Sequence, residues 1–521
     1  MFDIDFSRLA EQLLYMPDSP MIFSSGIFLF LFLGFTLIYN VLGKADTLRI
    51  LFVTLFSYYF YYKSSGMFFC LLALVTVSDY FIAKAIGGVG KGSLAKTLVF
   101  LSLLLDLGLL VFFKYTNFLG ETICTMLNSI GVHVPSSISG SSLNSVAWQP
   151  RDIFLPVGIS FFTFQSLSYT IDVYRGNIKP LNRLLDYAFY VSFFPQLVAG
   201  PIVRARDFIP QIRRPLMVTD GMFGTGVFFI IAGLFKKAVI SDYVSVNFVE
   251  RIFDQPDLYS GLENLLAVYG YTLQIYCDFS GYSDMAIGIA LLLGFEFPKN
   301  FDSPYKSASI TEFWRRWHIS LSSWLKDYLY ISLGGNRHGK LRQYFNLLMT
   351  MLLGGLWHGA SLNFILWGGL HGIFLCIDKI WHSVCSFLSP LTYLPSKHNP
   401  HPKKNWLVVL LGGLITFHLV AACWVLFRAS SFDVAEQMFH QIFYKFQPQI
   451  FLQWCQSYAA VGSLMLLGYI LHFMPQSLSD KAKSFVTRTP LLVKAILLVL
   501  VIFIVIQIKS SDVQPFIYFQ F

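Results

Sequence analysis

The chain has few charged residues for its length. Of its 521 residues only 13% are Asp, Glu, Lys or Arg, whereas 55% are hydrophobic, and the mean hydropathy is +0.59. Because soluble domains are about a quarter charged, this deficit excludes an ordinary soluble domain and indicates a protein that crosses a membrane several times. The net charge of +9 therefore indicates basic cytoplasmic loops, and we expect no nucleic acid partner.

Several sequence signatures of other protein classes are also missing. The seven cysteines are scattered without a CxxC pair, so neither a disulfide framework nor a metal site is predicted. Residues 1–20 are acidic rather than basic, the reverse of a signal peptide, and we expect the apolar run from Met21 to remain as the first span. The chain contains no phosphate-binding loop, G-x-S-x-G or H-E-x-x-H motif. We expect no bound cofactor and no metal.

Long apolar runs are abundant instead. A membrane-spanning helix needs about 20 apolar residues, and this length predicts an all-α polytopic protein with about eleven transmembrane helices. Segments 262–295 and 343–380 are longer than one span requires, so each can be tilted, broken or a helical hairpin, and a hairpin would change the count by one. The candidate spans are 22–42, 48–63, 66–86, 96–116, 153–174, 219–240, 262–295, 343–380, 405–427, 456–474 and 491–509.

The loop charges predict an orientation. Lys44 and Arg49 follow the first span, and the loop 117–150 contains neither Lys nor Arg. Because cytoplasmic loops are enriched in basic residues, we expect the N-terminus outside and, after eleven crossings, the C-terminus in the cytoplasm.

One apolar segment does not suit this scheme. Residues 185–200 have positive charge on both sides, so a single crossing would place one basic loop on the wrong face. We therefore predict a re-entrant hairpin that turns near Pro195 and Gly200 and is covered by protein or water. An ordinary span that violates the charge rule is the alternative.

The segment 296–342 combines basic and aromatic residues. Around His318, apolar residues recur at Phe313, Trp317, Leu321 and Trp324, which is a helical spacing. This pattern predicts an amphipathic helix at the cytoplasmic interface, with cations toward headgroups and rings toward the acyl region.

Two histidines are candidates for the chemistry. An ionisable residue at membrane depth is costly and indicates a functional site, and imidazole exchanges protons near neutrality. His358 lies among glycines in LLGGLWHGA, where its neutral ring can accept the proton of a hydroxyl that attacks an acyl carbonyl. His318 can orient the substrate or complete a proton path. The alternative for His358 is a structural role between helices, although such a role suits His371 better. The alternative for His318 is a solvated position on an interfacial helix.

Acidic and turn residues add weaker signals. Asp278 and Asp284 lie in IYCDFSGYSD, six residues apart, and so share no helical face. Gly281 and two serines indicate a broken or cavity-lining helix, and we expect both acids to pack and hydrogen-bond along a water-filled passage. The basic turn GGNRHG at 334–339 is weak evidence for an anion.

Long strings of the chain resemble the membrane-bound O-acyltransferase family, most closely its alginate O-acetyltransferase branch. The string around His318 is NFDSPYKSASITEFWRRWHISLSSWLKDYLYISLGGNR, and the string around His358 is LLGGLWHGASLNFILWGGLHG. The matching segments are 21–25, 154–176, 193–204, 274–295, 300–337, 352–372 and 515–521.

The resemblance implies a single membrane domain over 21–521 that follows an extension at 1–20. It implies about eleven spans, re-entrant segments and a central funnel closed near mid-membrane. It also implies that His358, in the WHG motif, is the principal catalytic residue and that His318 is the second. To the wall of the funnel we assign Trp357, Asp278, Asp284, Arg315, Arg316, Trp317, Asn336 and Arg337.

The resemblance further implies a reaction and its partners. The donor would be acetyl-CoA or another cytoplasmic acetyl source, and the acetyl group would pass across a bacterial inner membrane to an extracytoplasmic partner that modifies an exported polysaccharide. Two alternatives remain within the family, a D-alanyl transferase of teichoic acid-type polymers and a peptidoglycan O-acetyltransferase. A non-catalytic exporter or channel with a proton path is the alternative from another class.

Overall fold

Every regular element of the computed structural model is a helix, within the residues that the structure describes: 11–17, 20–43, 45–130, 153–388, 406–508 and Phe516. The prediction of an all-α membrane protein is confirmed. Among these residues five helical stretches are long and apolar enough to cross a membrane, or up to seven if each sharply bent pair is one span. One stretch, Asp46–Val89, takes in two predicted spans, and the count of eleven stays a prediction.

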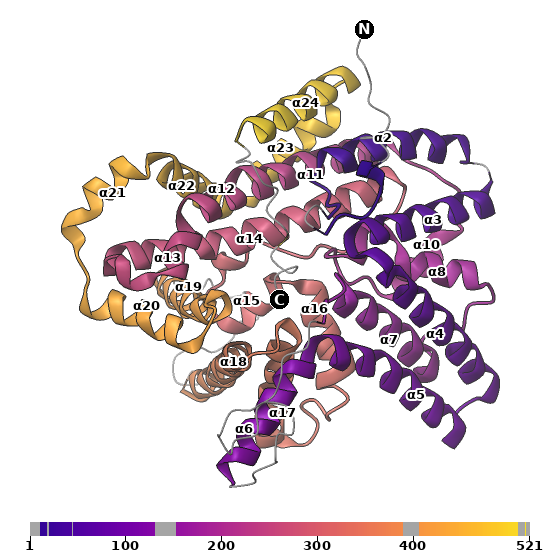
Figure 1. The fold of residues 1–521 in the computed structure, drawn as a ribbon, viewed down its shortest axis with the longest axis horizontal. Coiled ribbons are helices and arrows are strands. Elements are labelled where there is room, and N and C mark those ends of the chain that lie inside the picture. The colour runs from indigo at the N-terminus through magenta and orange to yellow at the C-terminus, as the bar shows by residue number, and fades with distance from the viewer. Residues whose placement is uncertain are drawn as a thin grey trace, which may run out of the picture.

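In Figure 1, helices α2–α5, α7, α8 and α10 lie on the right of the molecule, α11 and α14 cross its upper half, and α6 lies at the bottom. Their bounds are α2 Gly26–Val41, α3 Asp46–Ser65, α4 Phe69–Val89, α5 Ser93–Leu110, α6 Thr116–Ser129, α7 Ile159–Arg175, α8 Leu184–Ser192, α9 Phe194–Leu197, α10 Ala205–Ile212, α11 Asp220–Leu234, α12 Asp242–Val244, α13 Glu250–Asp254 and α14 Gly261–Leu292.

The helices of the C-terminal half complete a ring around the short helices α15 and α16 (Figure 1). Their bounds are α15 Ile310–Arg316, α16 Ile319–Trp324, α17 Gly339–His358, α18 Leu362–Leu388, α19 Trp406–Arg428, α20 Phe432–Tyr444, α21 Phe451–Ser457, α22 Ala459–Phe473, α23 Gln476–Arg488 and α24 Leu491–Ile508.

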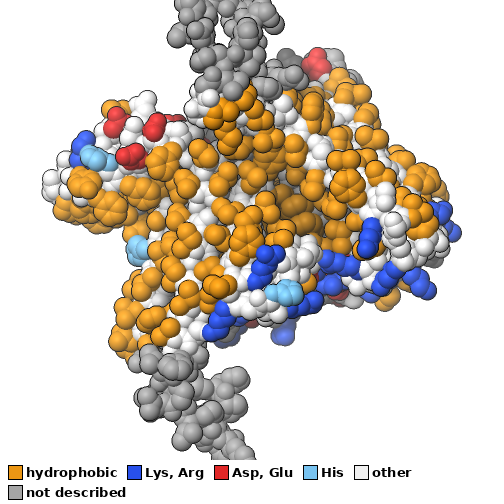
Figure 2. Space-filling model, turned by 90° about the horizontal axis from the view of Figure 1, so that it is seen from below, with side chains coloured by type: hydrophobic (Ala, Val, Ile, Leu, Met, Phe, Trp, Pro, Cys, Tyr) orange, Lys and Arg blue, Asp and Glu red, His pale blue; other side chains and the backbone are white. Residues whose placement is uncertain are grey.

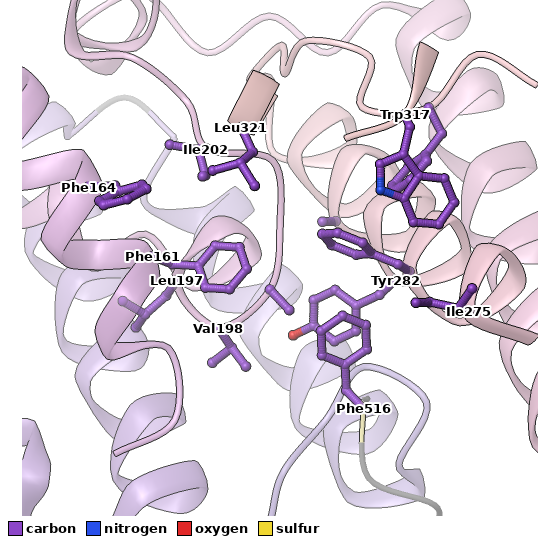
Figure 3. Close-up of a cluster of buried hydrophobic side chains, with 14 of the residues drawn as sticks. Phe161, Phe164, Leu197, Val198, Ile202, Ile275, Tyr282, Trp317, Leu321 and Phe516 are labelled. Carbon is purple, nitrogen blue, oxygen red and sulfur yellow. The ribbon is translucent and has the colours of Figure 1, made fainter. Parts of the chain in front are cut away.

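The centre of the ring is filled by apolar side chains. Figure 3 shows Phe161 of α7 and Leu197 facing Tyr282 of α14 and Phe516. The rings of Tyr282 and Phe516 lie 4.9 Å apart, and all four side chains are buried. Phe516, far from α14 in sequence, is therefore part of the core.

Of the two alternatives predicted from Gly281, the cavity-lining helix agrees with the structure, since Tyr276, Cys277 and Asp284 line a cavity, and the broken helix is wrong. Helix α14 is continuous. It runs for 32 residues, and its glycines serve packing. A Cβ at Gly281 would lie 2.8 Å from the carbonyl oxygen of Gly233 on α11, and a Cβ at Gly288 would lie 2.6 Å from that of Gly226. These two pairs let the backbones of the antiparallel helices α11 and α14 touch, which small residues permit in membrane proteins.

The predicted outer loop 117–150 is partly helical. Helix α6 continues α5 through a short π-helix, so that one helical stretch runs from Ser93 to Ser129. The hydroxyls of Thr116, Thr122 and Thr125 donate to carbonyls four residues earlier, which satisfies polar groups without leaving the helix. Residues 131–150 of this loop lie outside the described residues.

The predicted turn near Pro195 and Gly200 is confirmed. Helix α8 has only nine residues, and the short helix α9 follows it directly. The chain then folds back so tightly that a Cβ at Gly200 would lie 2.5 Å from the carbonyl oxygen of Pro195. Residues 189–200 are all buried, as non-helical backbone in a membrane protein requires.

The long apolar segment 343–380 is a helical hairpin. Helices α17 and α18 are antiparallel: a Cβ at Gly355 would lie 2.2 Å from the carbonyl oxygen of Phe364, and Gly372 packs on Leu348. The helix is interrupted between His358, where α17 ends, and Leu362, where α18 begins. Both ends of the hairpin therefore lie on one side, which changes the predicted count of crossings by one.

The predicted amphipathic helix around His318 is wrong in two respects. Backbone φ at His318 is +42°, in the left-handed region, so the helix is divided into α15 and α16. The rings of Phe313 and Trp317 are buried inside the protein rather than turned to lipid. The helical spacing is produced by residues that pack on α7, α18 and α19, and periodicity cannot distinguish such packing from a lipid-facing surface.

Charge is unevenly distributed over the surface. In Figure 2 most of the visible Lys and Arg gather along one edge, below a broad hydrophobic face. Contacts also join two basic segments of the chain: Arg175 donates to the carbonyl of Asp327 at 3.1 Å and to the hydroxyl of Ser332 at 3.0 Å. The loop after α7 and the segment 296–342 thus share one face, as the positive-inside rule requires of cytoplasmic loops.

Candidate functional site

His358 is the last residue of α17 and lies at the tip of the α17–α18 hairpin. Its side chain is 4% exposed. The next residue, Gly359, is close-packed, since a Cβ there would lie 2.0 Å from the ring of Phe364. Any larger residue would force the tip open, so the sequence WHG fixes the position of the imidazole.

Aromatic rings surround the imidazole of His358. Ring centroids lie 4.9 Å away at Trp357, 5.1 Å at Trp367 and 5.2 Å at Phe427, all in edge-on orientations. These three rings come from α17, α18 and α19. They exclude water from the imidazole and hold it in one orientation.

Lys114 and Tyr115 hold the end of α17 in place. The ammonium of Lys114 donates to the carbonyl oxygens of Trp357 and His358, both at 2.7 Å, and the Tyr115 hydroxyl donates to that of Leu356 at 2.6 Å. The last carbonyls of a helix lack intrahelical partners and carry partial negative charge. A cation at this point satisfies the backbone beside the candidate catalytic residue.

His318 is fully buried, contrary to the solvated interfacial position left open by the sequence. Its exposed fraction is 0%, and its ring packs edge-on against Phe279 at 4.6 Å. Burial lowers the pKa of His318 to about 3, so the ring is neutral at pH 7. Its Nδ1 lies 3.2 Å from the amide oxygen Oδ1 of Asn300.

The two histidines belong to one aromatic cluster. Trp357 lies between them, with ring centroids 6.5 Å from His318 and 4.9 Å from His358. Phe161 and Phe164 of α7 pack on Trp357 at 5.6 and 5.3 Å, and Figure 3 shows these two rings on the same helix. The structure thus brings together residues that lie 40 positions apart in the sequence.

A groove lies beside this cluster on the basic side. It has a volume of about 410 Å³ and runs between the segment Thr311–Tyr330 and the hairpin α17–α18. Arg315, Lys326 and Lys379 line it together with Leu325 and Met351. Met351 precedes His358 by two helical turns, or about 10 Å along α17. The groove can receive a molecule with an anionic part and an apolar part.

Asp278 and Asp284 neutralise intramembrane lysines. Asp278 pairs with Lys237 at 2.6 Å, both about 3% exposed, and Asp284 pairs with Lys236 at 2.5 Å. Paired charges are the usual solution at membrane depth. As predicted from their spacing, the two acids face different partners.

The remaining predicted wall residues divide into three groups. Arg315 is exposed in the groove, whereas Arg316 forms ion pairs with Glu312 and Asp302. Trp317 is buried against Trp424 at 4.9 Å. Asn336 and Arg337 are exposed beyond the far end of α17, about 30 Å of helix from His358. They therefore lie far from the two histidines, and their assignment to the wall of the funnel stays a prediction.

His371 has the structural role that the sequence favoured. The indole N–H of Trp314 donates to its Nδ1 at 3.3 Å, which joins α15 to α18. No group of three or more His, Cys, Asp or Glu side chains in the described part of the chain is arranged to hold a metal ion.

Sequence reasoning missed Lys114 and Asn300. Lys114 is the lone Lys or Arg between Lys96 and Arg151 and falls at the end of a candidate span. An ionisable residue at membrane depth indicates a functional site, so Lys114 could have been identified in the same way as the two histidines. Asn300 gives no such signal, because an Asn in a loop is ordinary. Its role depends on the fold, which brings residue 300 beside residue 318.

Comparisons with known proteins point in one direction. Residues 174–422 match the membrane-bound O-acyltransferase family. The chain is 42% identical to a probable alginate O-acetylase of Azotobacter vinelandii over 81% of this chain and 78% of that protein. It is 36% identical to a probable alginate O-acetylase of Pseudomonas putida over 96% of this chain and the whole of that protein. A peptidoglycan O-acetyltransferase of Helicobacter pylori is 36% identical over 80% of this chain and 78% of its own length.

Proposed function

This chain belongs to the membrane-bound O-acyltransferase family, and we propose that it moves an acetyl group from a cytoplasmic donor across the bacterial inner membrane for O-acetylation of an exported, alginate-like polysaccharide. The observation that carries the proposal is the buried imidazole of His358 at the tip of the hairpin, in a chain that matches alginate O-acetylases over most of its length.

In this proposal His358 is the general base. It accepts the proton of the acceptor hydroxyl while the hydroxyl oxygen forms a bond to the acetyl carbonyl carbon. When the C–S bond of a thioester donor breaks, the proton passes from His358 to the departing sulfur. The products are an ester and a free thiol, and His358 returns to its starting state. His318 acts beside it, across Trp357.

The groove on the basic side is the proposed entrance for the donor. A donor such as acetyl-CoA carries phosphates on one end and a thioester on a long, narrow arm. Arg315, Lys326 and Lys379 at the groove can bind phosphates, and the apolar floor leads along α17 toward His358. The cytoplasm is the source of such thioesters, which agrees with a basic, cytoplasmic face.

The hairpin α17–α18 revises the expected orientation of the chain. A hairpin in place of one span makes the number of crossings even, so an outside N-terminus implies an outside C-terminus rather than the cytoplasmic one expected from eleven crossings. Two contacts agree with this arrangement: Arg428 at the end of α19 lies 3.9 Å from Asp254 before α14, and Lys306 donates to the carbonyl of Met474 at 2.7 Å. We propose that the acetyl group is received outside by an extracytoplasmic partner that carries it to the polysaccharide.

Peptidoglycan is the competing acceptor, because one relative is named a peptidoglycan O-acetyltransferase and matches 80% of this chain. Mass analysis of a strain lacking the gene, and of the same strain carrying the gene on a plasmid, separates the two. We expect ester-linked acetyl to disappear from exported polysaccharide and to return with the plasmid. Loss of acetyl groups from peptidoglycan alone would identify peptidoglycan as the acceptor. Unchanged acetyl content in both polymers would contradict the proposal.

A further inference from the structure

The side chain of Asn300 is fixed by groups whose hydrogen-bonding direction is known. The backbone N–H of Ser320 lies 3.2 Å from one atom of the Asn300 amide, and the Ser320 hydroxyl lies 2.9 Å from the same atom. A backbone N–H can only donate, so the atom that faces it is the oxygen Oδ1. The amide nitrogen of Asn300 donates to the hydroxyl of Ser283 at 3.1 Å.

This assignment decides the tautomer of His318. Nδ1 of His318 faces the same oxygen at 3.2 Å, and an oxygen acceptor requires a proton on the facing nitrogen. Because the ring is neutral, the proton on Nδ1 leaves Nε2 unprotonated. A rival bond from the Ser320 hydroxyl to Nδ1 would be longer, at 3.5 Å, and would set the lone pairs of Nδ1 and Oδ1 against each other.

The position of His318 is held from the backbone as well. The N–H of Ile319 donates to the carbonyl of Asn300 at 2.9 Å, and the N–H of Ile202 donates to the hydroxyl of Ser320 at 3.0 Å. His318 is one of only two described non-glycine residues with positive φ, at +42°. Such a conformation persists only where surrounding contacts hold it, and residues 300, 319 and 320 supply them.

Nε2 of His318 has no hydrogen-bond partner among the described residues, although the side chain is fully buried. Buried polar atoms are almost always paired, so an exception needs an explanation. The ring of Trp357, the residue before His358, lies 6.5 Å from the His318 ring. The His318 ring that carries this unpaired atom therefore belongs to the cluster where transfer is proposed.

We propose that Asn300 is a positioning residue that holds His318 as the Nδ1–H tautomer, so that Nε2 accepts a hydrogen bond from an O–H or N–H group of the substrate. The proposal deepens the proposed function and rests on transfer taking place at this cluster. Asn300 does not touch the substrate and acts through His318.

The tautomer can be measured directly by ¹⁵N NMR of the full-length protein labelled at histidine, in bilayers. The protonated and unprotonated nitrogens of a neutral imidazole have well-separated shifts, and a His318→Gln variant identifies the His318 signals. We expect Nδ1 protonated and Nε2 unprotonated in the wild-type protein. Protonated Nε2 would overturn the proposal, and this measurement requires no variant of Asn300 to fold.

Asn300→Leu, which has a similar shape but no acceptor, tests the consequence. We expect a mixture of His318 tautomers and a fall in the rate of acetyl transfer of about tenfold or more, with little change in the KM for the donor. Ser283→Ala is the matched control, because it removes the other partner of the same amide and leaves Oδ1 in place; we expect wild-type tautomer and rate. An unchanged tautomer or an unchanged rate in Asn300→Leu would overturn the proposal. Failure of the proposed function would instead appear as no transfer by the wild-type protein, with the tautomer still readable.

Discussion

Single side chains decide the geometry of the candidate site at the residue scale. Lys114 is far from His358 in sequence, yet it donates to the carbonyls of both Trp357 and His358. Hydrogen bonds from a charged donor contribute about 1.5–3 kcal/mol. Without them the last turn of α17 would keep unsatisfied carbonyls at the point where the imidazole must be held.

We expect Lys114→Met to reduce acetyl transfer about tenfold or more. Lys114→Arg should retain part of the wild-type activity, since Arg keeps the charge and several donors. Lys96→Met, an exposed lysine at the start of the same helical stretch, is the matched control and should behave as wild type. The measurement is acetyl ester in the acceptor polymer at equal membrane levels of each variant. Full activity of Lys114→Met would exclude a role for this cation.

Much of the residue-scale account was predictable from the sequence. A histidine among glycines inside an apolar run identifies His358, because such a residue is costly in a membrane. The burial of His318 was not predictable, since the alternation of Arg with Trp around it is equally typical of an interface helix. Only the fold reveals that Trp317 packs on Trp424 and that Asn300 reaches His318.

Glycine pairs determine how the long helices pack at the element scale. Gly233 of α11 faces Gly281 of α14, and a Cβ at Gly233 would lie 2.5 Å from the Gly281 carbonyl oxygen. The hairpin α17–α18 depends on Gly355 in the same way. The sequence indicated that Gly281 was special, but it did not indicate whether this glycine breaks a helix or allows another helix to approach.

Gly233→Ala should separate α11 from α14 and lower the unfolding temperature of the purified protein. Gly221→Ala on the same helix is the matched control, because the nearest atom to a Cβ there is 3.8 Å away. We expect it to be neutral or to stabilise by up to about 1 kcal/mol, the helix-propensity difference between Gly and Ala. Equal unfolding temperatures for the two variants would contradict the close contact between α11 and α14.

The whole molecule has a basic face and a ring of helices around a packed centre (Figures 1 and 2). The number of crossings could not be read from the sequence, because segment 343–380 has the composition of one long span and the structure of a hairpin. Its close-packed glycines form contacts that hydropathy does not measure. This difference changes the side on which every later loop is expected.

Orientation can be tested with single cysteines in a background where the exposed Cys70 and Cys455 are replaced by Ser. We expect Asp257→Cys, before α14, to react with a membrane-impermeant maleimide in intact spheroplasts, and Lys179→Cys, after α7, to react only after lysis. Both positions are exposed. Reaction at Lys179→Cys in intact cells would reverse the proposed orientation.

The account depends most on His358 as the centre of acetyl transfer. The direct measurement is the ester-linked acetyl content of exported polysaccharide from a deletion strain that carries either the wild-type gene or His358→Ala, with membrane levels and thermal unfolding matched. We predict full acetylation with the wild-type gene and almost none with His358→Ala. Wild-type acetylation by a folded His358→Ala protein would contradict the account.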